Sequence, residues 1–222
     1  MGRAKEISVK VIPSKIANDF VKKHHYSGKV VPNSRLHFGA FLDGRLHGVM
    51  SYGSSLDKSK VIGLVQGTGW NEFIELNRMA FDDYLPRNAE SYCIAQSIRL
   101  IKKNAPHVKW VISFADGTQC GDGTIYRASN FVLTQIKTNT SLRRNPKTGE
   151  VMQDMTAYHR GMLSEFRTWD KVQGYQLRYI YFIDKSCKDK LTVPILPFSK
   201  IDEIGAGMYK GQKITQAERH NK

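Results

Sequence analysis

The chain has 222 residues, 41% hydrophobic and 24% charged, which is the composition of a globular protein and excludes a disordered one. Its 34 Lys and Arg against 20 Asp and Glu give a net charge of +14, which favours a polyanionic partner such as nucleic acid over simple solubility. The three cysteines are widely spaced, and no apolar run approaches the about 18 residues of a membrane span. We therefore expect a cytoplasmic protein that crosses no membrane.

The N-terminal third predicts a strand, a helix and a hairpin. Residues 6–13 alternate between polar and apolar side chains, as in a strand, and Ser14 is a fitting N-cap for a helix through residues 15–25. After a loop, residues 35–53 form two apolar runs around Asp43-Gly44, a dipeptide suited to a type I′ turn. This is the clearest hairpin signal in the sequence.

The middle and last parts alternate between strand and helix signals. Ile94, Ile98 and Ile101 recur at helical spacing within residues 89–105, which predicts a long helix with one buried side. The other expected elements are a strand at 73–81, a buried strand at 108–116, a short helix at 123–131, and strands at 131–138 and 175–183.

This order of elements predicts an α+β single-domain fold with a mixed, mostly antiparallel central sheet flanked by helices. It is the layout of the GNAT-like acyltransferase fold. We expect a catalytic domain over residues 1–204, with an irregular basic insertion around 140–170, and a flexible basic tail over residues 205–222.

A first candidate site follows the first predicted helix. His24, His25, Tyr26 and Ser27 run into Gly28, and loops held by a rigid scaffold often carry functional groups. An imidazole can act as a base or a metal ligand near neutral pH. The alternative is structural, because imidazoles also suit a helix C-terminus and Gly28 suits its left-handed end.

A second candidate site follows the buried strand at 108–116. Asp116 lies at the end of this strand, where open sheets bind ligands, and Tyr126 follows a glycine-containing stretch. The glycines match neither a GxGxxG motif nor a P-loop. The structural alternative is that Asp116 caps the next helix and Tyr126 belongs to the core.

A third group comprises polar residues on or near the strand at 73–81. Glu75, Asn77 and Arg78 stand where apolar residues are expected, and buried polar groups need partners. Arg87 and Asn88 precede the long helix and could meet a phosphate at its positive end. The pattern therefore indicates either a substrate-binding site or a solvated surface.

A fourth group is a basic loop within residues 140–170. Arg143, Arg144 and Lys147 lie near aromatic residues such as Tyr158 and Phe166, a combination suited to a nucleic-acid groove. Charge runs of this kind are also common in solvated loops. We expect these three basic residues to contact DNA.

Three stretches together resemble the Mom proteins of Mu-like phages: "HHYSGKVV", "ELNRMAFDD…PRNAES…IAQSIRLIKK…P" and "WVISFADGT…GTIYRASNF". The resemblance covers roughly residues 20–132. It implies a GNAT-like transferase that converts DNA adenine to N6-acetamido (methylcarbamoyl) adenine and so protects phage DNA from host restriction. It also implies catalytic roles for His25, Tyr26, Asp116 and Tyr126, and a bound iron, for which His25 and Asp116 are candidate ligands.

The start of the long helix makes Arg87 and Asn88 candidates for substrate binding, and the resemblance adds His24, Ser27, Glu75, Asn77 and Arg78. The partner it implies is double-stranded DNA with a flipped adenine, in the cytoplasm of the bacterial host.

The donor of the transferred group stays open. Residues 84–91 lack the glycines with which acetyl-CoA-using GNAT enzymes approach the pyrophosphate. The added group also contains a nitrogen that acetyl lacks, so acetyl-CoA and a glycine-like or aminoacyl donor are both candidates. Two other functions compete, a GNAT N-acetyltransferase acting on a protein or small amine and a non-catalytic DNA-binding protein.

Overall fold

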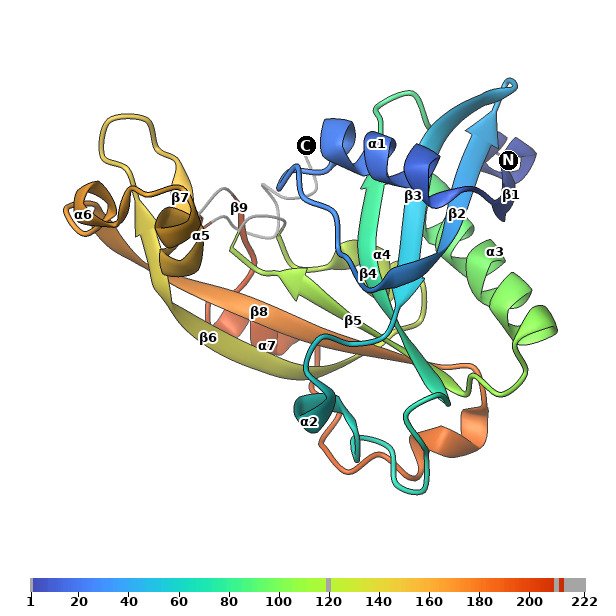
Figure 1. Cartoon of the computed structure of the whole chain (residues 1–222). Helices are drawn as coiled ribbons and strands as arrows, with labels where there is room; N and C mark the ends of the chain where they lie inside the picture. The colour runs from blue at the N-terminus through green and yellow to red at the C-terminus, as the bar shows by residue number, and fades with distance from the viewer. Residues whose placement is uncertain (1, 119–120, 210–211, 214–222) are drawn as a thin grey trace. The chain divides into compact units, whose positions relative to one another are not determined.

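The computed structural model describes residues 2–118, 121–209 and 212–213 (Figure 1). The chain divides into two compact units. Unit 1 comprises Met1–Ser113, Ile125–Val132 and Ile180–Pro194. Unit 2 comprises Phe114–Thr124, Leu133–Tyr179 and Ile195–Lys222.

Unit 1 is built on a mixed sheet. Its strands are hydrogen-bonded in the order β1 (Ser8–Val11), β2 (Ser34–Leu42), β3 (Arg45–Gly53), β4 (Phe73–Phe81) and β5 (Trp110–Asp116), which extends into unit 2. Neighbours from β1 to β4 are antiparallel, and β5 runs parallel to β4. Asp43 and Gly44 both have positive φ (50° and 76°), which confirms the type I′ geometry expected for the β2–β3 hairpin.

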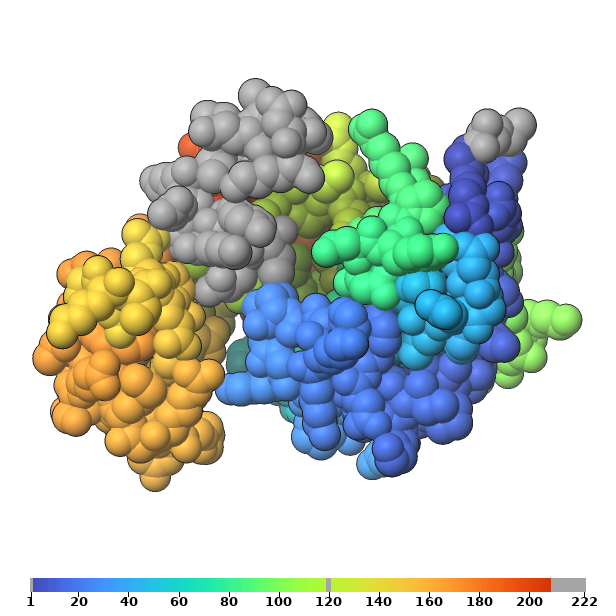
Figure 2. All heavy atoms as spheres, turned by 90° about the horizontal axis from the view of Figure 1, so that it is seen from above, coloured from blue at the N-terminus to red at the C-terminus, as the bar shows by residue number. Residues whose placement is uncertain are grey.

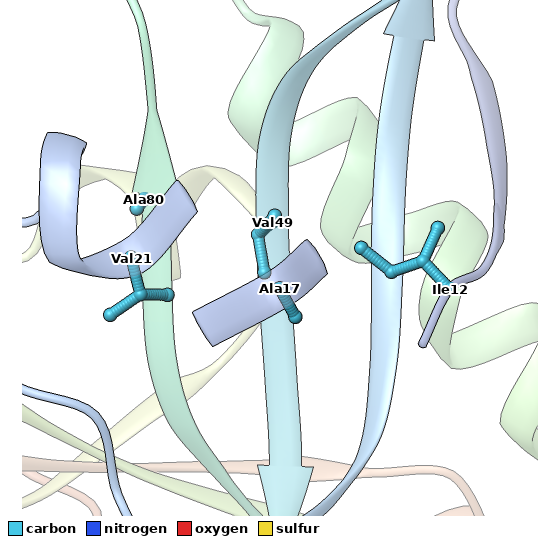
Figure 3. Close-up of a cluster of buried hydrophobic side chains, with 5 residues drawn as sticks. All are labelled: Ile12, Ala17, Val21, Val49 and Ala80. Carbon is cyan, nitrogen blue, oxygen red and sulfur yellow. The ribbon is translucent and has the colours of Figure 1, made fainter. Parts of the chain in front are cut away.

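Two helices cover opposite faces of this sheet (Figure 1). On one face lies α1 (Ser14–His24), where Ala17 and Val21 pack with Ile12, Val49 and Ala80 (Figure 3). On the other face lies α3 (Ala89–Asn104), whose Ser97 hydroxyl is 2.6 Å from that of Tyr52 on β3. Removing either core from water stabilises the fold by roughly 1.5–3 kcal/mol per large apolar side chain. The shorter elements of this unit are η1 (Arg3–Glu6), α2 (Lys58–Val61), α4 (Thr124–Ala128, from its second residue) and η2 (Lys185–Lys188).

A β-bulge interrupts the pairing of β3 with β4. Ser51 pairs with Arg78, whereas the next residue, Tyr52, pairs with Leu76, so that Asn77 is the extra residue on β4. Bulges re-aim side chains and are common beside functional sites. This one places Asn77 and Arg78 next to each other where polar groups from three strands meet.

Unit 2 contains a hairpin with its own helices. Strand β8 (Asp170–Phe182, whose last residues belong to unit 1) neighbours β6 (Val132–Arg144), and β6 neighbours β7 (Val151–Gln153). Two short helices, α5 (Asp154–His159) and α6 (Leu163–Phe166), follow β7. The remaining elements are α7 (Ser199–Glu203) and a small hairpin of β9 (Met208–Tyr209) and β10 (Gln212–Lys213).

These observations confirm the α+β class and the mixed, mostly antiparallel sheet flanked by helices. Two local expectations are wrong. Residues 140–170 are ordered as strand, hairpin and helices rather than irregular. Ser14 is the first residue of α1 instead of its N-cap, which is Pro13. Of the expected tail, residues 210–211 and 214–222 lie outside the described residues, within which no helix is long and apolar enough to cross a membrane.

Candidate active site

The imidazole of His25 is held by the turn that ends α1. The His25 N–H donates to the Val21 carbonyl (2.9 Å), and Gly28, with φ +59°, donates back to the His25 carbonyl (2.8 Å). Within this turn, Nδ1 of His25 accepts the Ser27 N–H (3.2 Å) and lies 2.8 Å from the Ser27 hydroxyl. The fixed backbone therefore sets the direction of the ring.

These contacts also determine the protonation state of His25. A backbone N–H can only donate, so Nδ1 must be an acceptor, and the neutral ring carries its proton on Nε2. Burial, together with the nearby positive charge of Arg78, lowers the pKa of His25 from 6.5 to about 4. At neutral pH His25 is therefore an uncharged ring that offers Nε2–H as a hydrogen-bond donor.

A row of polar side chains crosses the sheet on the face covered by α1. His37 on β2 pairs with Ser51 on β3, and Ser51 pairs with Arg78 on β4. Ser51 and Arg78 follow the same alternation as Val49 and Ala80, which pack against α1. The row therefore lies on the same face as His25.

Two backbone carbonyls fix the guanidinium of Arg78. Its Nε donates to the carbonyl of Lys29 (3.1 Å) and its Nη1 to that of Asn77 (2.9 Å). Within the described part of the chain, Nη2 makes no hydrogen bond and the group forms no ion pair. Arg78 thus presents a positive charge in a fixed position beside His25.

Glu75 and Asn77 add a carboxylate and an amide to this region. The Ser55 hydroxyl donates to Glu75 (2.5 Å), and the Ser34 hydroxyl donates to Oδ1 of Asn77 (3.0 Å). Burial raises the pKa of Glu75, and the hydrogen bond from Ser55 offsets only part of that effect. The Glu75 side chain is therefore largely removed from water, which disfavours its charged form.

Three buried polar atoms here have no hydrogen-bond partner among the described residues: Oδ1 of Asn33, Nε2 of His37 and Nδ2 of Asn77. His37 is 3% exposed and Asn77 7% exposed, and burial lowers the pKa of His37. Unpaired buried groups cost about 1–3 kcal/mol each, so these atoms require a partner, which a bound water or a ligand can supply. We call this region the polar cluster; its members are His25, Asn33, Ser34, His37, Ser51, Glu75, Asn77 and Arg78.

The structure thus brings together the predicted residues His25, Glu75, Asn77 and Arg78, with Ser27 as the support of His25. His37 was not predicted. Its only signal in the sequence is a histidine inside an otherwise apolar strand, and its partner Ser51 comes from another strand.

Tyr126 lies on the other face of the sheet, in the core beside α3. Its side chain is 9% exposed and packs against Phe131, with ring centroids 5.4 Å apart. Its hydroxyl is 2.9 Å from that of Ser113, which in turn lies 3.0 Å from the carbonyl of Leu76. Tyr126 therefore belongs to a buried hydrogen-bonded chain, and its side chain is also a core residue.

Asp116 lies in unit 2 at the end of β5, as expected. Its carboxylate accepts the N–H of Thr118 (2.9 Å), and the next residue, Gly117, donates to the carbonyl of Tyr175 (2.9 Å). The alternative that Asp116 caps the next helix is wrong, because Asp122 accepts the N–H of Thr124 at the start of α4 (3.0 Å). The carboxylate shapes the turn after a buried strand.

The remaining predicted residues of unit 1 lie near the surface. His24 stacks on Phe20 (4.3 Å between ring centroids), and the exposed ring of Tyr26 tilts against His25 (4.4 Å). Arg87 and Asn88 are exposed before α3, and Asn88 is its N-cap, with φ 67°.

Contacts between side chains tie the segment before α3 to the β2–β3 hairpin. Tyr84 stacks on His47 (4.3 Å) and donates to Asp43 (2.6 Å), while His47 Nδ1 lies 2.9 Å from Asp82. Figure 2 shows this green segment against the light-blue hairpin turn. Residues 84–88 lack the glycines of acetyl-CoA-using GNAT enzymes, and the contacts of Tyr84 hold the start of this segment against the hairpin.

The predicted DNA-binding residues lie on the β6–β7 hairpin of unit 2. Arg143 is half-buried and donates from Nη1 to the Trp169 carbonyl (2.8 Å). Lys147 is exposed in the turn that Asn145 organises by accepting the Lys147 N–H (2.9 Å). Arg144 is the last residue of β6.

The resemblance implies a bound iron, which would need side chains that converge as metal ligands. Nδ1 of His25 already accepts from Ser27, and within the described ranges no three His, Cys, Asp or Glu side chains converge as metal ligands. These residues do not fit an iron site, and we assign no step to iron.

Comparison with known sequences identifies the family. The sequence model of the Mom protein family matches residues 6–200. The chain belongs to the Mom protein family. It is 33% identical over 201 residues to the methylcarbamoylase mom of Escherichia phage Mu, and the match covers 86% of this chain and 82% of that one.

Comparison with solved structures finds distant likenesses to acetyltransferases. The ribosomal-protein-S18-alanine N-acetyltransferase of Escherichia coli matches with a TM-score of 0.46 and 12% identity, covering 80% of this chain and 94% of that one. A GNAT family acetyltransferase of Elizabethkingia anophelis, with acetyl-CoA bound, matches with a TM-score of 0.47 and 11% identity, covering 80% and 98%. We infer neither donor nor substrate from likenesses this distant.

Proposed function

We propose that this chain is a DNA-modifying transferase that converts adenine to N6-acetamido (methylcarbamoyl) adenine in double-stranded DNA. The observation that carries the proposal is membership of the Mom family over most of the chain, with a methylcarbamoylase of a phage as a relative. On phage DNA, this modification would protect the genome from host restriction enzymes.

The polar cluster supports this proposal because its groups suit the orientation of neutral and anionic partners. The Nε2–H of neutral His25 can donate to a carbonyl or a ring nitrogen. The fixed guanidinium of Arg78 can stabilise a negative oxygen beside it, and charge-assisted hydrogen bonds of this kind are strong. Tyr26, beside His25, completes this side of the proposed site.

The chemistry requires an extruded base and a stronger nucleophile. The N6 amine of adenine is paired in the duplex and its lone pair is delocalised, so the base must leave the stack. In the proposed reaction the N6–carbon bond forms while Asp116 accepts a proton from the amine. Tyr126, the proton donor that the resemblance implies, is 9% exposed in the core on the sheet face opposite the polar cluster, so in this proposal the leaving group takes its proton from water.

Two donor classes are compatible with the transferred group. Acetyl-CoA would supply the two carbons and leave the nitrogen to a second source, whereas a glycine-like or aminoacyl donor would supply both. The absence of glycines at residues 84–91, where a GNAT enzyme approaches the pyrophosphate, favours the second class. Growth on glycine labelled with ¹³C and ¹⁵N separates them when the label is measured in the added group apart from the purine ring, because only a glycine-derived donor places both labels there together.

Contact of Arg143, Arg144 and Lys147 with DNA is part of the proposal. Replacing all three with Gln should weaken DNA binding and reduce the slope of log K against log salt by roughly 0.9 for each phosphate that the variant no longer neutralises. Arg143 also holds the Trp169 carbonyl, so the thermal stability of the variant must be compared with that of the wild type. An unchanged slope would exclude these contacts.

The proposed function is tested by expression of the protein with a plasmid, digestion of the plasmid to nucleosides, and mass spectrometry. We expect deoxyadenosine that carries one additional acetamido group. Unmodified nucleosides together with tight DNA binding would indicate a non-catalytic DNA-binding protein. Unmodified nucleosides without DNA binding would favour an acetyltransferase of a protein or small amine.

A further inference from the structure

The hairpin and helices of unit 2 form a small body with its own core. Met152 on β7, Ala157 on α5, and Phe166 and Trp169 around α6 are all buried and pack together. Arg143 on β6 adds to it, because its guanidinium donates to the Trp169 carbonyl (2.8 Å) and lies 5.8 Å from the centre of the Phe166 ring. A separate core of this kind holds β7, α5 and α6 in fixed positions, so side chains on their surface are held in fixed positions as well.

This frame surrounds a pocket of about 420 Å³, lined by residues of β6, α5, α6 and the start of β8. That volume lies within the range of about 300–1,000 Å³ typical of small-molecule sites. All of the lining residues belong to unit 2. The pocket is therefore large enough for a nucleotide.

The charge of the pocket favours an anion. Arg143, Arg167 and Lys171 line it, against the single carboxylate of Asp154. Within the part of the chain that the structure describes, none of these three cations forms an ion pair. Their charges are therefore not compensated by neighbouring carboxylates, and a phosphate would supply the missing charge.

The pocket also presents flat and flexible apolar groups. Tyr158 and Met155 lie one turn apart on α5 and are 62% and 58% exposed. Both side chains are therefore accessible to a ligand from solvent. A tyrosine ring beside positive charges is the combination with which proteins stack an unpaired base and hold its phosphate.

We propose that this pocket binds one unstacked nucleotide of the DNA substrate. The base lies against Tyr158 and Met155, and its phosphates contact Arg167 and Lys171, while Arg143 holds the wall in place. The inference rests on the proposed action on DNA and adds a nucleotide-binding site to it, outside the polar cluster. Basic residues continue along the chain from Arg143 at the pocket to Arg144 and the exposed Lys147, as contact with a DNA strand longer than one nucleotide would require.

The test measures binding of a short single-stranded oligonucleotide that contains 2-aminopurine, whose fluorescence is quenched by stacking. With the full chain, we expect quenching and tight binding. Tyr158→Ala should lose the quenching and weaken binding roughly five- to hundred-fold, the range of one base-stacking contact. Tyr158→Phe keeps the ring and should retain both properties, which separates stacking from a loss of folding.

The charged wall is tested in the same assay. Arg167→Gln with Lys171→Gln should weaken binding and reduce its salt slope by roughly 0.9 for each phosphate left without its cation. Lys102→Gln with Lys103→Gln, two exposed lysines at the end of α3, removes the same charge elsewhere and is the matched control. Equal effects of the two double variants would overturn the inference, because net charge alone would then explain the binding.

A failure of this inference can be told from a failure of the proposed function. Wild-type protein that modifies plasmid adenine, with Tyr158→Ala binding and quenching like the wild type, overturns the nucleotide pocket alone. Wild-type protein that leaves plasmid adenine unmodified overturns the proposed function, whatever the pocket variants do.

Discussion

The protonation state of His25 gives the sharpest quantitative prediction. In the unfolded chain the imidazole titrates near 6.5, whereas in the folded protein burial and Arg78 lower its pKa to about 4. At a pH between these two pKa values, His25 is protonated in the unfolded state but neutral in the folded state. The stabilising contribution of His25 is therefore complete above pH 6.5 and decreases as the pH falls towards 4.

Linkage sets the size of the effect. Between pH 8 and pH 5, the two pKa values correspond to a loss of about 2 kcal/mol in the free energy of unfolding. His25 is only partly buried, so solvent screening reduces this to about 1 kcal/mol. In His25→Gln this contribution disappears, because glutamine does not titrate.

Urea unfolding of the wild type and His25→Gln at pH 8 and pH 5 measures this contribution. The free energy of unfolding of the wild type should fall by about 1 kcal/mol more than that of the variant. Arg78→Gln should reduce the difference, since the nearby positive charge is the second cause of the lowered pKa. Equal pH dependence of wild type and His25→Gln would show that His25 titrates alike in the folded and unfolded states, and so would exclude the lowered pKa.

Three further variants test other parts of the structure. In Gly53→Ala, the added Cβ would lie 2.1 Å from the Asn33 carbonyl oxygen, so the free energy of unfolding in urea should fall by about 1–3 kcal/mol. Gly69→Ala is the control and should be nearly neutral, because the nearest atom to its Cβ would be 3.4 Å away. Burial raises the pKa of Glu75 and so disfavours the charged form in the folded state; Glu75→Gln should increase stability at pH 7, and a gain that persists unchanged at pH 3 would contradict this cause. Asp116→Ala should abolish the modified adenine while DNA binding survives, and wild-type levels of adduct in nucleoside digests would exclude its proposed role.

The elements that the sequence predicts well depend on local rules. Asp43-Gly44 predicts the hairpin because only a few residue types adopt positive φ at both positions. Ile94, Ile98 and Ile101 predict α3 because their spacing places them on one buried side. Both signals lie within a few residues of the structure they specify.

The polar cluster could be predicted only in part. His25 and Arg78 stand out in the sequence, but His37 does not, because its site is created by the register with Ser51 and Arg78 on other strands. The bulge that makes Asn77 the extra residue of β4 leaves no clear sequence signal either. Pairing between strands is non-local, so the alternation of residues within one strand does not predict which residues of the next strand lie beside them.

The regular structure of residues 140–170 could not be predicted from the sequence for a related reason. The basic residues there suggest a solvated loop, whereas Met152, Phe166 and Trp169 form a core across two helices and a hairpin. Each of these helices has only a few residues, too few for a clear helical period.

Participation of the polar cluster of unit 1 in adenine modification is the part of the proposed function that the structure adds to the family assignment. It is tested most directly by the amount of modified deoxyadenosine in plasmid DNA from cells that express wild type, His25→Ala, Arg78→Ala or the control Lys102→Gln. We predict the adduct with the wild type and the control, and a loss of at least about ten-fold with Arg78→Ala, whose charge-assisted hydrogen bond is worth about 1.5–3 kcal/mol. With His25→Ala we expect a smaller loss of about two- to ten-fold, because a neutral ring makes a hydrogen bond worth about 0.5–1.5 kcal/mol. Wild-type amounts of adduct in both cluster variants, expressed at equal levels, would exclude a role of the polar cluster in the reaction.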